Sequence, residues 1–152
     1  MRFLGVDFGG RRLGLALSDA TGLIARPWRT IAAAASPAAS AEAVAALLAG
    51  AGAAPEAAEV GAIVVGLPRR LNGDDTDQTA PARAFAAALA DRTGRPVHLQ
   101  DERLTSREAE SRLARTEPDW RARKAHIDAM AAGIILQDFL DGRPPEPAGD
   151  PA

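Results

Sequence analysis

The sequence of 152 residues contains no cysteine. This absence excludes a disulfide framework, a thiolate metal site and a cysteine nucleophile. The sequence also lacks an apolar run of membrane-spanning length, and we find no signal peptide because the N-terminus passes directly into a predicted strand. We therefore expect a cytoplasmic protein that has no membrane partner and that is a monomer or a homodimer.

Lysine is almost absent as well, because Lys124 is the only one. The net charge of −2 and the isoelectric point of about 5.7 argue against broad, nonspecific coating of nucleic acid. The basic residues are nevertheless unevenly placed, so a local basic surface is compatible with an acidic protein. Those that crowd the later half of the chain include Arg69, Arg70, Arg103, Arg107, Arg112, Arg115, Arg121, Arg123 and Lys124.

The length and composition are those of one soluble domain. Hydrophobic residues make up 47% of the chain and charged residues 25%, which is ordinary for a globular protein large enough to bury a core. The segment from Gly142 onward is rich in proline and has no apolar cluster. We therefore predict a single domain at residues 1–141 and a disordered tail at 142–152.

The first eighteen residues predict a β-hairpin. Two apolar runs, at 2–8 and 13–18, flank a turn that contains Gly9 and Gly10. Strand alternation places Asp7 on one face with Phe3 and Gly5, and the intervening residues on the other face. A carboxylate beside two glycines leaves room for a metal ion or a phosphate. The alternative is that Asp7 only hydrogen-bonds the backbone of the turn.

The rest of the chain alternates between predicted strands and helices. An antiparallel meander followed by this alternation predicts an α/β fold, in which a mixed five-stranded sheet carries helices on both faces: three antiparallel strands and two parallel ones. Right-handed crossovers would then bring the carboxyl ends of the parallel strands to one edge, where ligands of such sheets bind. The further strands are predicted at 27–31, 62–68 and 96–102, and the helices at 37–50, 81–92, 107–115 and 121–140.

Three carboxylates are candidates for a shared site. Asp7 and Glu102 stand at the carboxyl ends of predicted core strands, and Asp128 occupies the helix stripe that carries Ala132 and Ile135 toward the core. A buried, unpaired carboxylate costs several kcal/mol and usually finds a cation. Oxygen ligands favour Mg²⁺ or Mn²⁺, and two such ions about 3.5–4 Å apart can activate water for phosphodiester hydrolysis. The alternative for Asp128 is a salt bridge with Lys124 or Arg121.

The sequence supports the other candidate residues less strongly. Lys124 lies one helical turn before Asp128 and could reach a scissile phosphate, although a solvated lysine is the commoner outcome. Arg69, Arg70 and Asn72 belong to a polar loop that is suited to contact with a phosphate backbone, and an ordinary solvated loop is an equal alternative. Neither histidine has a matching acid and nucleophile, which argues against a hydrolase triad.

Several motifs, in this order, resemble the YqgF/RuvX family of bacterial RNase H-like proteins over residues 1–141. The resemblance implies an RNase H-like fold, a nuclease that matures the 5′ end of precursor 16S ribosomal RNA, and Asp7, Glu102 and Asp128 as its acidic, metal-binding triad. Arg103, beside Glu102, joins the expected substrate contacts. The motifs are Val6-Asp7-Phe8-Gly9, Leu13-Gly14-Leu15-Ala16, Gly66-Leu67-Pro68, Asn72-Gly73, Asp101-Glu102-Arg103-Leu104-Thr105-Ser106 and Ile127-Asp128-Ala129-Met130-Ala131-Ala132.

Three rival interpretations remain. RuvC-type Holliday junction resolvases carry their second acid on the earlier strand, which here ends Val65-Gly66-Leu67 without one, so cleavage of branched DNA is less favoured than RNA processing. The stretch from Gly5 to Gly10 also resembles the phosphate loop of actin-like and sugar kinases, but those enzymes need a second domain that 152 residues do not supply. The third is a non-catalytic module that binds nucleic acid or a transcription factor.

Overall fold

The computed structural model describes residues 1–50, 55–70, 72–102 and 120–143, together with the side chains of all of these except 120–126. Arg103, the helix predicted at 107–115 and most of the predicted tail lie outside the described residues. The side chains of Lys124 and Arg121 lie outside them too.

The described strands form one mixed sheet in the order β3-β2-β1-β4-β5. The first three strands are antiparallel neighbours, whereas β4 runs parallel to β1 and β5 parallel to β4. The predicted sheet of three antiparallel and two parallel strands is therefore confirmed. The strands are β1 (Arg2–Phe8), β2 (Arg12–Ser18), β3 (Ala25–Ala32), β4 (Val60–Pro68) and β5 (Val97–Glu102).

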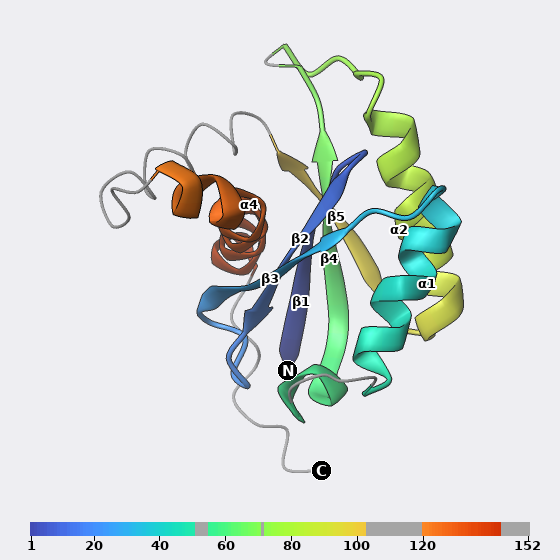
Figure 1. Ribbon diagram of the computed structural model, residues 1–152. Coiled ribbons are helices and arrows are strands. Elements are labelled where there is room, and N and C mark those ends of the chain that lie inside the picture. The colour runs from blue at the N-terminus through green and yellow to red at the C-terminus, as the bar shows by residue number, and fades with distance from the viewer. Residues whose placement is uncertain (51–54, 71, 103–119, 144–152) are drawn as a thin grey trace.

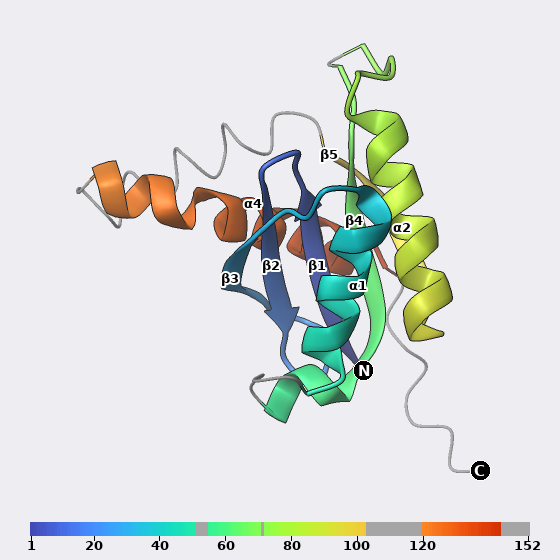
Figure 2. The same cartoon turned by 45° about the vertical axis from the view of Figure 1, so that its right-hand side comes forward.

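Helices cover both faces of this sheet, as Figures 1 and 2 show. The helices α1 (Pro37–Leu48) and α2 (Thr79–Thr93) lie side by side on one face, and α4 (Trp120–Gly142) crosses the other. A short 3-10 helix spans Pro55–Glu59. Within the described ranges, none of the helices has the length and apolar character needed to cross a membrane.

Helix boundaries follow from local chemistry. The hydroxyl of Ser36 accepts a hydrogen bond from the Ala39 N–H and caps α1, and Pro37 opens the helix, where a missing N–H costs nothing. Gly94 ends α2 in the left-handed conformation, with φ of 65°. The predicted helix starting near Pro37 and the predicted end of the next helix near Gly94 are both confirmed.

The alternation of β1 divides the core into two layers. Leu4, Val6 and Phe8 pack against α1 and α2, and the Phe8 ring stacks on Phe85 with 4.8 Å between ring centroids. Phe3 points to the other layer, whose helical partners come from α4. Asp7 shares the α4 face with Phe3, as strand alternation predicted.

Candidate functional site

Asp7 lies near the carboxyl end of β1, directly opposite Gly14 of β2. Gly14 allows α4 to approach β2 closely, because a Cβ atom at this position would overlap the carbonyl oxygen of Asp128. The α4 backbone therefore rests on β2 beside Asp7. Small residues on the helix alone do not produce this approach, since the strand must lack a side chain as well.

Glu102 is the last residue of β5, and its side chain reaches back across β4. The space comes from Gly66, where a Cβ atom would lie 2.5 Å from Glu102 Oε2 and 2.6 Å from Ile135 Cδ1. Through this gap the carboxyl groups of Glu102 and Asp7 form a hydrogen bond. Two carboxyl groups can do so only when a proton lies between them.

The pKa values of both acids are raised. Burial is the largest cause of the rise in the pKa of Asp7, and the Asp128 carboxylate adds to it, whereas the hydrogen bond with Glu102 opposes it. Burial and then the Asp7 charge raise the pKa of Glu102. The pair therefore retains a proton in conditions where exposed carboxyl groups have lost theirs.

Asp128 faces the same site from α4, but it has a cationic neighbour. Arg12 Nε lies 2.9 Å from Asp128 Oδ2 in an ion pair. The contact does not have hydrogen-bond geometry, and Oδ2 is buried and has no hydrogen-bond partner among the described side chains. A salt bridge, the predicted alternative for Asp128, is thus present, and the partner that the structure describes is Arg12. The side chains of the predicted partners, Lys124 and Arg121, lie outside the described residues.

The described side chains do not form a closed metal cage. Among them, no three aspartate, glutamate, histidine or cysteine groups are positioned to hold one ion together. Asp7 and Glu102 are in contact with each other. Asp128 is near enough to raise the pKa of Asp7, but its carboxylate is paired with Arg12. The donor set nevertheless fits a hard divalent cation, because it offers carboxylate oxygens, one of them buried and unsatisfied.

The polar loop after β4 lies at the same edge of the sheet as this cluster (Figure 1). Its groups bond mainly to one another: Asn72 donates its side-chain amide to Asp74 Oδ2 at 3.1 Å and accepts the Asp74 N–H at 2.9 Å. Arg69 Nε lies 3.9 Å from Asp75 Oδ1, and Arg70 donates its backbone N–H to Asp74. The loop is therefore structured by local contacts.

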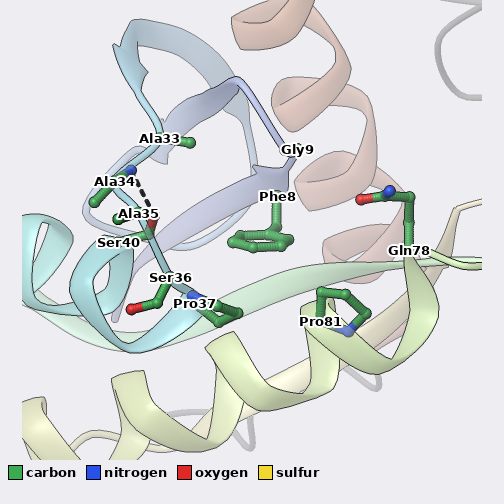
Figure 3. Close-up of a pocket in the computed structure, with 11 residues that line it drawn as sticks. Phe8, Gly9, Ala33, Ala34, Ala35, Ser36, Pro37, Ser40, Gln78 and Pro81 are labelled. Carbon is green, nitrogen blue, oxygen red and sulfur yellow. Dashed lines mark hydrogen bonds between the residues drawn. The ribbon is translucent and has the colours of Figure 1, made fainter.

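A separate pocket of about 280 Å³ opens on the other face of β1 (Figure 3). Phe8 and Gly9 form one side, the start of α1 at Ser36 another, and Gln78 and Pro81 at the start of α2 a third. None of the described residues that line it has a charged side chain. The pocket is separate from the acidic cluster, since Phe8 and Asp7 point to opposite faces of the strand.

Sequence reasoning missed Arg12 as the partner of Asp128. A signal was available, because alternation along β2 places Arg12, Gly14 and Ala16 on one face, and Gly14 pairs with Asp7. Gly66 was noticed only as part of a motif, and its role in admitting Glu102 becomes clear only from the fold.

The sequence matches a known protein family and is similar to named relatives. A family model described as "RuvX: Holliday junction resolvase" matches residues 1–142. A protein of Pelotomaculum thermopropionicum named "Putative pre-16S rRNA nuclease" is 44% identical, over 98% of this chain and 94% of its own. A protein of the same name from Anaeromyxobacter sp. (strain Fw109-5) is 43% identical, over 94% of this chain and 98% of its own.

Two solved structures are also similar. One is T. thermophilus RuvC in complex with Holliday junction substrate, with a TM-score of 0.49 and 18% identity over 92% of this chain and 93% of that one. The other is a polyphosphate/ATP-glucomannokinase from an Arthrobacter strain, with a TM-score of 0.46 and 26% identity over 73% of this chain and 48% of that one.

Proposed function

This chain belongs to the RuvX family, and on that premise we propose that it is a divalent-metal-dependent nuclease whose substrate is the precursor of 16S ribosomal RNA. The name shared by relatives that are 43–44% identical over nearly the whole chain supports this substrate. The observation that carries the activity is the meeting of Asp7 and Glu102 at the carboxyl edge of the sheet, with Asp128 facing them from α4.

Asp7, Glu102 and Asp128 are the residues that would hold Mg²⁺ or Mn²⁺. The buried, unsatisfied Oδ2 of Asp128 supports this assignment, since an oxygen of this kind gains a partner when a cation binds. Such an ion, when bound, lowers the pKa of a water molecule and stabilises the leaving oxygen of a phosphodiester. The Asp7–Glu102 pair must lose its shared proton before both carboxylates can bind an ion.

The surroundings of the acids favour a long, anionic substrate. Gly9 and Gly10, in the turn after β1, have no side chains that would block the approach of a nucleic-acid backbone. Arg69, Arg70, Asn72, Arg103 and Lys124 stay proposed as substrate contacts, and the exposed position of Arg70 in the loop after β4 suits such a role.

The test is a cleavage assay on a precursor 16S ribosomal RNA fragment with Mg²⁺ or Mn²⁺. We expect Asp7→Asn to reduce the rate by about a hundredfold or more, because one ligand of the ion is lost. Asp91→Asn, which removes an exposed carboxylate from α2, is the matched control and should cleave like the unmodified protein. Cleavage that persists in EDTA, or in Asp7→Asn, would contradict the proposal.

The family model's description favours a second candidate substrate, the Holliday junction. A four-way DNA junction therefore belongs in the same assay. If the protein cuts the junction but not the RNA, the proposed nuclease activity stands and the proposed substrate is wrong.

A further inference from the structure

Arg12 forms an ion pair with one acid of the cluster, Asp128. Arg12 is the first residue of β2, after the turn that follows β1. Its side chain lies on the same face of β2 as Gly14, the face that α4 covers. Its Nε lies 2.9 Å from Asp128 Oδ2, and the two side chains are 48% and 24% exposed. One end of the pair therefore reaches solvent while the other adjoins the site.

The geometry of this pair is unusual for an arginine and a carboxylate. An optimal pair makes two parallel N–H···O bonds. Here the Oδ2 atom is buried and accepts no hydrogen bond from the part of the chain that the structure describes, Arg12 included. Charge alone holds the guanidinium against Asp128, so exchanging it for another cation breaks no aligned hydrogen bond.

We propose that Arg12 is a stand-in counter-ion, which neutralises Asp128 in the cation-free protein, releases it when a divalent cation binds, and then contacts a substrate phosphate. The inference rests on the proposed function, because it takes Asp128 as a metal ligand. A divalent ion on Asp128 Oδ2 would stand next to the guanidinium, and the two positive charges repel each other. The half-exposed arginine can turn away from the sheet.

A phosphate is the natural second partner of the released side chain. The guanidinium is planar and always charged, and it matches the two free oxygens of a phosphodiester as it matches a carboxylate. Arg12 lies beside the open Gly9–Gly10 turn, where the substrate backbone would pass. Arg12 is therefore a positioning residue that couples cation binding to substrate binding, and such coupling acts in both directions.

The first test measures the dissociation constant of Mn²⁺ by titration calorimetry. We expect Arg12→Gln to bind Mn²⁺ about fivefold more tightly than the unmodified protein, equivalent to about 1 kcal/mol, because the competing charge is gone. Arg11→Gln is the matched control, since it removes the same charge from an exposed neighbour, and solvent screening should keep its effect below about twofold. Unchanged or weaker binding by Arg12→Gln, or an equal gain in Arg11→Gln, overturns the proposal.

Arg12→Lys is a second control, because it changes the side chain but keeps its positive charge. The Mn²⁺ affinity of this variant should stay within about twofold of that of the unmodified protein. Thermal unfolding in EDTA shows whether each variant is folded. A gain of Mn²⁺ affinity in Arg12→Lys equal to that in Arg12→Gln would mean that the charge is not the cause, and would overturn the proposal.

The second test measures the binding of a short single-stranded RNA by fluorescence anisotropy, in EDTA and with Ca²⁺ as the oxygen-ligated cation. We expect Ca²⁺ to increase RNA affinity in the unmodified protein and in Arg11→Gln, and to increase it less in Arg12→Gln. An equal Ca²⁺ effect in all three proteins contradicts the transfer of Arg12 to phosphate.

Asp128→Asn separates this proposal from the proposed function. If Asp128→Asn binds Mn²⁺ as tightly as the unmodified protein, the metal-ligand set itself is wrong. If Asp128→Asn loses Mn²⁺ affinity while Arg12→Gln shows no gain, the metal site stands and only the role of Arg12 fails.

Discussion

Asp7 and Glu102 differ from ordinary surface acids because each has lost most of its contact with water. Burial disfavours the charged form of both acids, and repulsion adds to this effect, from Asp128 at Asp7 and from Asp7 at Glu102. The hydrogen bond between the two acids fits a pair that keeps one proton. Without a cation, ionising this pair therefore opposes folding. Asp7 and Glu102 thus provide the chemistry of the site, and their ionisation lowers the free energy of unfolding.

This cost predicts how stability depends on pH in EDTA. The folded protein holds protons on Asp7 and Glu102 that the unfolded chain releases at about pH 4, and it releases the last of them only as the pH passes the pKa of Glu102, at about 9. The free energy of unfolding should therefore decrease as the pH rises through this window. Asp7→Asn should flatten the slope and melt at a higher temperature than the unmodified protein at pH 8.

Thermal unfolding at several pH values between 5 and 9 measures this effect. Asp91→Asn, which removes an exposed carboxylate, should follow the unmodified protein. Added Mn²⁺ should raise the melting temperature at pH 8 more than at pH 5, because the ion binds the deprotonated acids. A melting temperature of Asp7→Asn below that of the unmodified protein at pH 8 would contradict this account.

Sequence reasoning reached most of the residue-scale picture, but not the partner of Asp128. Strand alternation correctly placed Asp7 opposite to Phe8, and the helical stripe correctly pointed Asp128 toward the sheet. The predicted salt-bridge partners, Lys124 and Arg121, are neighbours on the same helix, and their side chains lie outside the described residues. Arg12 is more than a hundred residues away, and only the crossing of α4 over β2 brings it near.

At the scale of elements, the contact between α4 and the hairpin positions the site. Gly14 lets the Asp128 backbone rest on β2, and Gly66 lets Glu102 cross β4 toward Asp7. The predicted order of elements was right for every strand and α-helix that the structure describes, whereas the short 3-10 helix at Pro55–Glu59 was not predicted. Boundaries were less accurate: β3 and β4 each begin two residues earlier than predicted, because pairing with β2 and β1 extends them.

Gly14→Ala tests this contact. The added Cβ atom would overlap the Asp128 carbonyl oxygen, so α4 must shift or the protein must lose stability, by about 1–3 kcal/mol or more. Gly10→Ala is the control, since a Cβ atom there meets nothing within 4 Å. We expect chemical denaturation to show a loss for Gly14→Ala and little change for Gly10→Ala. Equal stability of the two variants would show that the helix does not rest on β2 as described.

At the scale of the whole molecule, the candidate functional residues gather at one edge of the sheet. The parallel strands β1, β4 and β5 all end there, so Asp7, the polar loop and Glu102 lie at the same edge although they are distant in the sequence. The carboxyl ends of these strands can be followed in Figure 1. Topology therefore made the site predictable in outline. The distances within it were not predictable, because they depend on glycines whose effect is felt only through the tertiary contacts of α4.

The predicted single domain can be tested by truncation. The core contribution of α4 reaches Leu140, and the Arg143 guanidinium lies over the Phe3 ring, 4.5 Å from its centroid. A chain that ends at Arg143 should melt at the same temperature as the full chain. A chain that ends at Gln137 loses Leu140 and Phe139 from the second core layer and should melt at a lower temperature. If the chain ending at Arg143 melts much earlier than the full chain, the predicted domain boundary is wrong.

The most direct test of the central claim is anomalous diffraction from crystals soaked in Mn²⁺. We predict an anomalous peak between β1 and α4, with carboxylate oxygens of Asp7, Glu102 and Asp128 at about 2.0–2.2 Å and with Arg12 no longer on Asp128. No peak at this edge of the sheet, or a peak that leaves Asp128 paired with Arg12, would contradict the account.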